Sequence, residues 1–366
     1  MIPRVGKPVI KFNGMGIRSV LVLINPRAGY RQALNYFTVT LQHQLDKEGV
    51  VYKVRQSPPD DMTAVLRTER SEEWEAVVLV GGDGTFNAYV NHAHAPEAHA
   101  KWGEKPILII PTGMLNGIAT STGHGSPEAT VPALRYGKIL KLPLWEASLD
   151  GIPVALVAAS VSVGYFADMI FDGHQLRMKA QESHAMMLPR RRHLWASLYN
   201  TFYRFRSLHA NVDLYADDKA LDPTTSIRGP LRTVVASQMP QVFPGYSLTP
   251  TAALGEDGNL HVTVATSAAS RLRMLHLVHR EGPARGILEE DGVSTHTARK
   301  VVIDFYDDAP VEDKEHAEAL KKDPWDPRLI RPPTRLGLFD GEVYPIPVAA
   351  PLVIKPSPLY APLIVP

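Results

Sequence analysis

Apolar runs of four to five residues recur along the first part of the chain, and each is followed by turn-forming residues. The three clearest runs are Val20–Ile24, Ala76–Val80 and Ile107–Ile110. Continuous apolar runs of this length are typical of strands buried on both faces of a parallel sheet. Residues 31–48 and 58–69 carry helical patterns and Val50–Val54 predicts a further strand. We therefore expect an α/β domain, a doubly wound parallel sheet with helices on both faces.

The second part of the chain contains longer β-rich runs with few helical segments between them. These runs are Val154–Val163, Arg232–Ser237, Leu260–Thr266 and Val301–Phe305. They predict a mainly antiparallel β-sandwich. Two helices are expected within it, at Leu194–Arg206 and around Ala268–His279. The first of them places Trp195, Tyr199 and Phe202 on one face.

This change of pattern predicts two domains, residues 1–143 and 144–366. Residues 307–335 are charged and contain prolines, which predicts a solvated insertion. Residues 345–366 are apolar and rich in proline, so we expect them to lie across one of the domains.

Composition narrows the function classes. A net charge of +1 gives no general signature of nucleic-acid binding. The absence of cysteine excludes disulfides, thiolate zinc sites and cysteine nucleophiles. The sequence shows no secretory signal pattern and no run of about 18 apolar residues that could span a bilayer. We expect a cytoplasmic protein that contacts membranes only peripherally.

The turn Gly81-Gly82-Asp83-Gly84-Thr85 joins an apolar run to helix-compatible sequence. Glycines let a backbone approach phosphate oxygens, and amides at a helix start direct partial positive charge towards an anion. A carboxylate in such a turn would repel a bare phosphate. Asp83 therefore predicts a bridging Mg²⁺, or a carboxylate that takes a proton during phosphate transfer.

The other two apolar runs also lead into turns, Asn25-Pro26-Arg27-Ala28-Gly29 and Pro111-Thr112-Gly113-Met114-Leu115-Asn116-Gly117. Ligands of open parallel sheets bind outside the carboxyl ends of the strands, so the three turns can converge on one nucleotide. Asn25 and Asn116 have an alternative role as local turn caps.

In this order, N-P-x-x-G, G-G-D-G-T and P-x-G-x-x-N resemble the diacylglycerol kinase catalytic domain of bacterial lipid kinases, sphingosine kinases and ceramide kinases. The resemblance implies a lipid kinase that uses ATP and Mg²⁺, with a nucleotide-binding first domain and a lipid-substrate second domain. The nucleotide-binding residues that it implies are Asn25, Pro26, Gly29, Gly81, Gly82, Gly84, Thr85, Asn87, Thr112, Gly113, Asn116 and Glu342.

Two Asp-Gly segments lie in the second domain, Glu256-Asp257-Gly258-Asn259-Leu260 and Phe339-Asp340-Gly341-Glu342. Each alone is typical of a hairpin turn. In the family that the chain resembles, the late Asp-Gly-Glu segment returns to the Gly-Gly-Asp-Gly turn. This implies Asp83 and Asp340 as catalytic residues and metal ligands, with Asp257 as a further metal ligand and Glu342 in support. Paired carboxylates titrate together, so which Asp takes the proton stays open.

The chain departs from the family pattern at two places. Ala88 replaces the usual acidic residue after Thr85-Phe86-Asn87, and Met114-Leu115 replaces a small hydroxyl residue and its neighbour in the third motif. The second change removes one side-chain phosphate ligand and leaves more of the binding to backbone amides.

The segment Gly164-Tyr165-Phe166-Ala167-Asp168 resembles the G-F-x-x-D segment of eukaryotic-type sphingolipid kinases, which implies Tyr165 and Asp168 as lipid-binding residues. Sphingosine kinases carry a second acid two residues further on, whereas ceramide kinases carry an aliphatic residue. The residue here is Ile170. Ceramide is therefore the favoured acceptor, and a sphingoid base or diacylglycerol is the alternative.

The basic residues Arg190, Arg191 and Arg192 precede Trp195, a combination that suits an anionic membrane surface. A basic loop before a core helix is the alternative. We expect peripheral membrane contact and no nucleic-acid partner, and leave a homodimer open. The rival functions are an NAD kinase, which also carries G-G-D-G-T, and a catalytically silent lipid- or nucleotide-binding protein.

Overall fold

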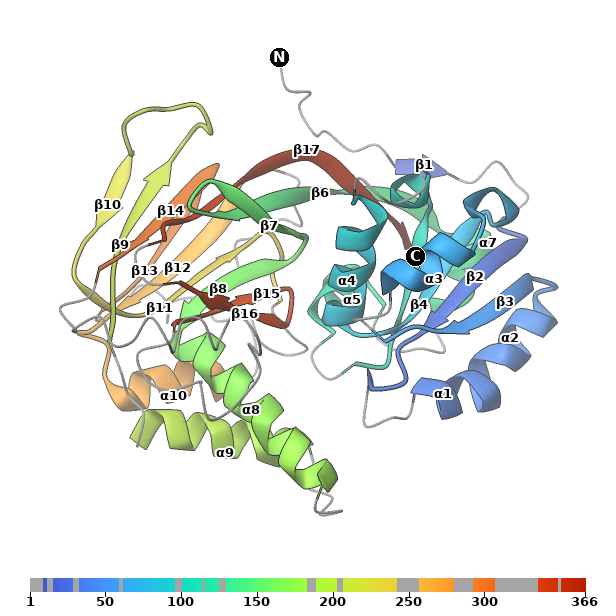
Figure 1. The fold of residues 1–366 in the computed structure, drawn as a ribbon, viewed down its shortest axis with the longest axis horizontal. Helices are drawn as coiled ribbons and strands as arrows, with labels where there is room; N and C mark the ends of the chain where they lie inside the picture. The colour runs from blue at the N-terminus through green and yellow to red at the C-terminus, as the bar shows by residue number, and fades with distance from the viewer. Residues whose placement is uncertain are drawn as a thin grey trace.

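The computed structural model describes residues 9–11, 16–28, 33–58, 62–95, 101–113, 116–124, 130–182, 189–202, 207–241, 257–279, 292–306, 335–347 and 350–366. The chain forms an α/β region and a β-rich region, and two long strands run through both (Figure 1).

The N-terminal region is a parallel sheet with the strand order β3-β2-β4-β5. Its strands are β2 (Ser19–Ile24), β3 (Val51–Gln56), β4 (Ala76–Gly81) and β5 (Ile107–Pro111). Its helices are α1 (Ala33–Tyr36), α2 (Gln42–Lys47), α3 (Met62–Thr68), α4 (Asp83–Ala93), α5 (Gly117–Ser121) and α7 (Ala133–Tyr136), with the short 3₁₀ turns η4 (Ser71–Glu73) and η5 (Trp102–Glu104).

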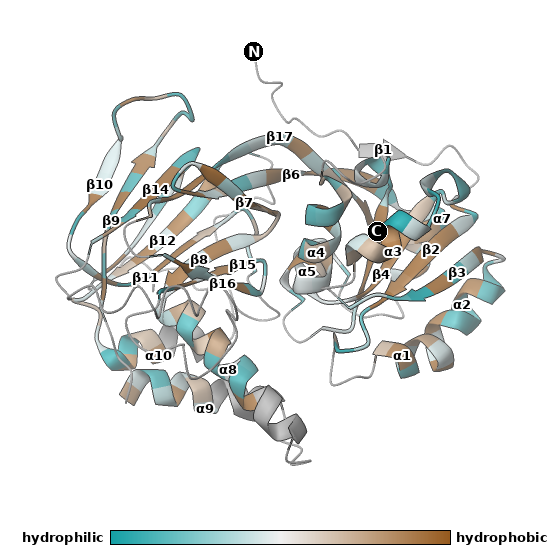
Figure 2. Cartoon of the chain, viewed as in Figure 1, coloured by the Kyte–Doolittle hydropathy of each residue, from teal (hydrophilic) through white to brown (hydrophobic). Residues whose placement is uncertain are grey.

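Both faces of this sheet are buried, as the apolar runs predict. Val20 and Val22 pack with Leu41 of the first helical segment, whereas Leu21 on the opposite face packs with Phe86 of α4. Burying each such side chain contributes about 1.5–3 kcal/mol. Figure 2 shows hydrophobic residues along β2 and β4, and both hydrophobic and hydrophilic residues on the neighbouring helices. The predicted α/β fold is confirmed.

The helix predicted at residues 31–48 is helical from Ala33 to Lys47, but its middle turn, η2 (Phe37–Leu41), is a π-helix. Residues 31 and 32 lie outside the described residues. The helix predicted to end at Glu69 corresponds to α3.

The C-terminal region consists of two antiparallel sheets that face each other across an apolar core. One has the order β10-β9-β14-β17-β6-β7 and the other β13-β12-β11-β8-β15-β16. The strands are β6 (Lys138–Leu149), β7 (Ile152–Val157), β8 (Ser160–Gly164), β9 (Leu208–Tyr215), β10 (Thr225–Ile227), β11 (Pro230–Ser237), β12 (Leu260–Thr266), β13 (Val293–Ala298), β14 (Lys300–Phe305), β15 (Arg335–Phe339), β16 (Glu342–Ile346) and β17 (Leu352–Val365). The predicted antiparallel β domain is confirmed.

Three helices, α8 (Tyr165–Glu182), α9 (Pro189–Phe202) and α10 (Arg271–His279), cover one side of this region (Figure 1). No described helix is long and apolar enough to cross a membrane. Of the charged insertion predicted at 307–335, only Arg335 is described, as the first residue of β15.

Strands β6 and β17 arch from one region into the other (Figure 1). β17 pairs with β6 along most of its length and with β5 at Leu363, and β1 (Val9–Lys11) pairs with the start of β6. The proline-rich tail is thus a strand shared by both regions, whereas we expected it to lie across one of them. The predicted boundary between residues 143 and 144 falls within β6 and stays a prediction.

The prediction of one continuous β-rich run over Val154–Val163 is wrong in one respect. The chain bends at Ala158 and Ala159 and forms two strands, β7 and β8. The amides at this bend hydrogen-bond to the carboxylate of Asp340, so the break is stabilised by a residue far away in the sequence.

Candidate active site

The turns that follow β2, β4 and β5 lie together at the carboxyl ends of the strands. The amides of Thr112 and Gly113 both donate to the carbonyl oxygen of Gly81, each at 3.0 Å. A Cβ atom on Gly82 would lie 2.9 Å from the Cα of Gly113, so the two backbones pass at a distance that only glycines allow. The structure therefore brings together the second and third motifs.

Asn25 links the first motif to the second. Its Nδ2 donates to Thr85 Oγ1 at 2.9 Å, and its Oδ1 accepts the Arg27 amide at 2.9 Å. Its side chain therefore organises the turn as an Asx cap and ties it to the glycine turn. Pro26 is half-buried in the same turn, and Gly29 lies outside the described residues.

Asp83 is the first residue of α4, and its carboxylate lies buried at the start of α5. Its two oxygens accept the amides of Gly117 at 2.7 Å and Ile118 at 3.1 Å. Burial raises the pKa of Asp83 to about 7, with a further rise from the charge of Asp340, while the two amide bonds oppose the shift. Asp83 is therefore a carboxyl group that can exchange a proton near neutral pH.

Asp340 occupies the turn between β15 and β16, has a φ of 49° and is 2% exposed. Its Oδ1 accepts the amides of Ala159 at 2.7 Å and Ser160 at 2.9 Å. Its Oδ2 accepts the Ala158 amide at 2.6 Å and Asn87 Nδ2 at 3.2 Å. Burial raises the pKa of Asp340, and these hydrogen bonds oppose that rise.

The late Asp-Gly-Glu turn contacts the glycine turn directly. The carboxyl group of Glu342 lies where a Cβ of Gly84 would be, and a Cβ on Gly341 would lie 3.8 Å from the Cβ of Asp83. This contact and the hydrogen bond from Asn87 to Asp340 bring the glycine turn and the late Asp-Gly-Glu turn into one site, as the resemblance implies.

The residues present fit a nucleotide phosphate chain. Among the described residues, Thr112 Oγ1 and Asn116 Oδ1 are buried without a hydrogen-bond partner, which leaves a hydroxyl donor and an amide oxygen for a ligand. Gly82, Gly84 and Gly113 are each partly exposed and carry no side chain, so phosphate oxygens can approach their backbone. Met114 and Leu115 lie outside the described residues.

The predicted metal ligands are only partly brought together. Asp257 accepts from His261 Nε2 at 2.9 Å and from the amide of Asn259 at 3.1 Å. No group of three or more Asp, Glu, His or Cys side chains in the described part of the chain could hold a metal. Asp83, each of whose oxygens accepts one hydrogen bond among the described residues, still fits Mg²⁺, which commonly takes one or two carboxylates, phosphate oxygens and water; the four hydrogen bonds to Asp340 leave that carboxylate no lone pair for a metal.

The residues predicted to bind the lipid lie at the start of α8. Tyr165 is buried, and its hydroxyl bonds to Thr201 Oγ1 at 2.6 Å and to Ser197 Oγ at 3.2 Å on α9. Asp168 is half-buried in the first turn of α8. Ile170 is fully buried in the apolar cluster beneath α8, so an acid at this position would be destabilising. The lipid-binding roles of Tyr165 and Asp168 stay predictions.

Two groups of site atoms were not expected from the sequence. The first is the run of amides at Ala158–Ser160, which only the bend between β7 and β8 exposes to Asp340. The second is Asn91, which bonds to the backbone of Leu156. Asn91 follows Asp83 and Asn87 at intervals of four residues, which places all three on one face of α4. This four-residue spacing was the sequence signal that could have identified Asn91.

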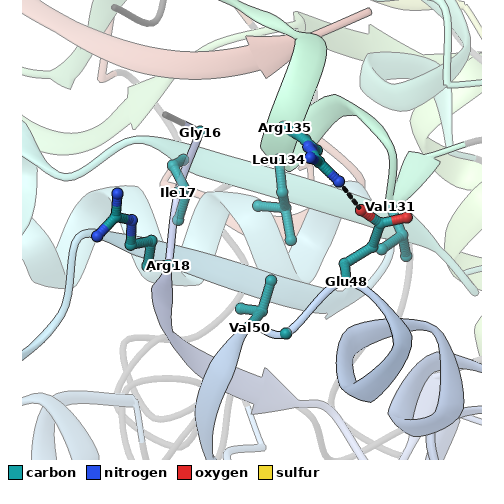
Figure 3. Close-up of a pocket in the computed structure, with 9 residues that line it drawn as sticks. Gly16, Ile17, Arg18, Glu48, Val50, Val131, Leu134 and Arg135 are labelled. Carbon is teal, nitrogen blue, oxygen red and sulfur yellow. Dashed lines mark hydrogen bonds and ion pairs between the residues drawn. The ribbon is translucent and has the colours of Figure 1, made fainter. Parts of the chain in front are cut away.

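A separate pocket of about 240 Å³ lies at the opposite end of the sheet (Figure 3). Ile17 and Val50 line it near the starts of β2 and β3, and Arg135 pairs with Glu48 at its edge with an N–O distance of 3.4 Å. It is therefore not part of the site at the carboxyl ends of the strands.

Comparison with known proteins finds sequence similarity in the first part of the chain. Residues 19–146 match the model of the diacylglycerol kinase catalytic domain. Sphingosine kinase B of Dictyostelium discoideum is 26% identical over 121 residues, which cover 33% of this chain and 16% of that protein. Human sphingosine kinase 1 is 29% identical over 106 residues, which cover 29% of this chain and 28% of that protein. The matched segment thus spans less than a third of these relatives.

Solved structures extend the similarity in fold to nearly the whole chain. A putative diacylglycerol kinase from Bacillus anthracis str. Sterne has a TM-score of 0.59 at 13% identity, with 96% of each chain covered. A second structure with a similar description has a TM-score of 0.58 at 12% identity and covers 96% of this chain and 98% of that chain. Residues 19–146, which carry the three motifs, are thus similar to the diacylglycerol kinase catalytic domain.

Proposed function

We propose that this protein is a lipid kinase that transfers the γ-phosphate of ATP to a hydroxyl of a membrane lipid. The observation that carries the proposal is the pair of buried carboxylates, Asp83 and Asp340, beside the glycine turn. Transfer to an alcohol requires held phosphates, a group that takes the hydroxyl proton and compensation of negative charge.

The hydrogen bonds favour Asp83 as the proton acceptor. A carboxylate offers about four lone-pair positions. Asp340 accepts four hydrogen bonds, whereas each oxygen of Asp83 accepts one among the described residues. The lipid oxygen would form the bond to the γ-phosphorus, the bond from that phosphorus to the ADP oxygen would break, and the hydroxyl proton would pass to Asp83.

The remaining residues would position the phosphates. Amides of residues 82–84 would bind phosphate oxygens, and the Thr112 hydroxyl would donate to one of them. Mg²⁺, held by Asp83 with Glu342 in support, would neutralise the charge that develops on the phosphates. Asp340 would keep the pKa of Asp83 raised, since a neighbouring negative charge disfavours ionisation.

We favour ceramide or a related neutral sphingolipid as the acceptor, with a sphingoid base or diacylglycerol as alternatives. A protonated amine needs a buried acid as its partner. Position 170 is apolar, and the carboxylate of Asp172 already accepts from Asn200 Nδ2 at 2.8 Å. These two features support a neutral acceptor.

A transfer assay with labelled ATP tests the function and the acceptor together. Ceramide, sphingosine and diacylglycerol are compared in matched mixed micelles, and NAD is assayed in solution. We expect the highest kcat/KM with ceramide and none with NAD. Transfer to NAD alone would support the dinucleotide kinase, and nucleotide binding without any transfer would support a silent binding protein.

We further propose that the protein contacts membranes peripherally through α9 and α10, which pack against each other. Trp195, Tyr199 and Phe202 of α9 are 57%, 47% and 49% exposed, and Leu272 of α10 is 69% exposed. The exposed Arg271 lies beside them and donates to the Phe202 carbonyl at 3.3 Å. Exposed aromatic side chains beside a cation are typical of an interfacial surface.

Vesicle sedimentation tests this surface. Combined Trp195→Ala and Phe202→Ala replacement should weaken binding to anionic vesicles about tenfold or more, because apolar area is lost. Tyr136→Ala is the matched control, since Tyr136 is 72% exposed in the α/β region. Equal binding of all variants, or binding that does not depend on the content of anionic lipid, would contradict the proposal.

A homodimer stays a prediction, which sedimentation velocity checks.

A further inference from the structure

The free edge of β7 is held by a side chain of the α/β region. β7 pairs with β6, and no other described strand pairs with it. On its open side, the Leu156 amide donates to Asn91 Oδ1 at 2.7 Å, and Asn91 Nδ2 donates to the Leu156 carbonyl at 2.9 Å. One side-chain amide thus makes the two bonds that a neighbouring strand would make.

Asn91 is itself fixed by its own helix. Its Nδ2 also donates to the Asn87 carbonyl at 2.9 Å, so both donor hydrogens and the acceptor oxygen are used. Asn87 adds a third bond from α4 to β7, from its Nδ2 to the Leu156 carbonyl at 3.1 Å. The position of Leu156 relative to α4 is therefore determined by three hydrogen bonds.

The segment that Asn91 holds is the one that holds Asp340. Two residues after Leu156 the chain bends, and the amides of Ala158–Ser160 donate to the Asp340 carboxylate. Asp83 begins α4, and Asn91 lies on the same face two turns further along. A shift of β7 relative to α4 would consequently change the separation of the two carboxylates.

We infer that Asn91 is a positioning residue for phosphoryl transfer, which sets the place of Asp340 relative to Asp83 by clamping β7 to α4. The inference rests on the proposed lipid kinase function. Asn91 acts on the chemical step through Leu156 and the bend at Ala158 and Ala159. The proposed phosphate-binding turns are at the other end of α4, away from Asn91. A misplacement of about 1 Å can lower a rate about a hundredfold, so a side chain outside the reacting groups can have a large effect.

Asn91→Ala is the first test, with Asn91→Ser as a milder variant in case the first does not fold. Each is assayed well below its own melting temperature. We expect kcat to fall about tenfold to a hundredfold while KM for ATP changes less than about threefold. Asn35→Ala is the matched control, since Asn35 is an exposed asparagine on α1, and it should leave both constants unchanged.

Hydrogen exchange supplies a readout that does not depend on activity. In Asn91→Ala, amides of residues 156–160 should exchange at least about tenfold faster, while exchange in β4 stays the same. Unchanged kcat in a folded variant, a change confined to KM, or unchanged exchange at 156–160 would each overturn the inference. If the wild-type protein transfers phosphate to no lipid, the proposed function fails, and the exchange experiment still decides whether Asn91 clamps this segment.

Discussion

The two carboxylates of the candidate site are held in different ways. Asp83 opens α4 directly after its own strand, and its partners are the Gly117 and Ile118 amides of the same α/β region. Asp340 belongs to the β-rich region, and four donors surround it, one of them Asn87 of α4. In the proposed function this difference gives the two residues different roles: Asp83 keeps capacity for a substrate proton, and Asp340 stabilises the architecture around it.

Asp83→Asn should have the largest effect. The amide cannot take a proton or bind a cation as a carboxylate does, so kcat should fall by about a hundredfold or more. The measurement is labelled phosphate transfer at saturating ATP and lipid. Asp304→Asn, a change at an exposed position of β14, is the control and should retain full turnover. Wild-type turnover in Asp83→Asn would contradict the proposed site.

Asp340→Ala should combine a loss of activity with a loss of stability. It leaves the amides of Ala158, Ala159 and Ser160 without their shared acceptor. Each of these amides that water does not reach should lower the free energy of unfolding by about 1–3 kcal/mol. We expect a lower urea midpoint than for Asp83→Ala, which frees only two amides. Equal or smaller destabilisation by Asp340→Ala would remove the structural role assigned to Asp340.

The pH dependence should report Asp83. With a pKa of about 7 in the free protein, kcat/KM should rise about tenfold per pH unit below pH 7 and level off above it. The stability of the folded protein should change with pH in the opposite direction, falling as the pH rises. The folded-state pKa is raised above 3.8, so the stabilising effect of the proton is full below about pH 4 and is lost as the pH rises to about 7.

The melting temperature of Asp83→Asn relative to the wild type should therefore increase between pH 5 and pH 8, because the variant never carries the buried charge. Asp304→Asn should show no such trend. A constant difference across this range would contradict the raised pKa of Asp83.

Gly84→Ala should have the smallest effect and tests the contact between the two turns. The new methyl group would occupy the place of the Glu342 carboxyl group. Because that group is the far end of a flexible side chain, it can move aside, and we expect a loss of about threefold to tenfold in kcat/KM. Glu342→Ala in the same chain should recover part of the loss if displacement of Glu342 is its cause. If the losses in kcat/KM caused by Gly84→Ala and Glu342→Ala simply add, the effect of Gly84→Ala comes from the backbone of the glycine turn and not from displacement of Glu342.

The sequence by itself determined the elements whose signals are local. Apolar runs identified β2, β4 and β5, and the turn residues after them identified the side of the sheet where Asp83 lies. Such strands are recognisable because burial on both faces demands apolar side chains at successive positions. The late Asp-Gly-Glu segment was found through a resemblance, since an isolated Asp-Gly pair is typical of any hairpin.

The tertiary structure alone decided the features that depend on distant partners. Nothing in Val154–Val163 marks a break, because the bend at Ala158 and Ala159 is stabilised by the carboxylate of Asp340. The tail has proline at position 356, where the pairing of β17 with β6 shifts register. Prolines argue against a strand in sequence, yet they are tolerated at such an irregularity, where no amide donor is needed. The raised pKa of Asp83 likewise arises only when folding removes its carboxyl group from water and places Asp340 beside it.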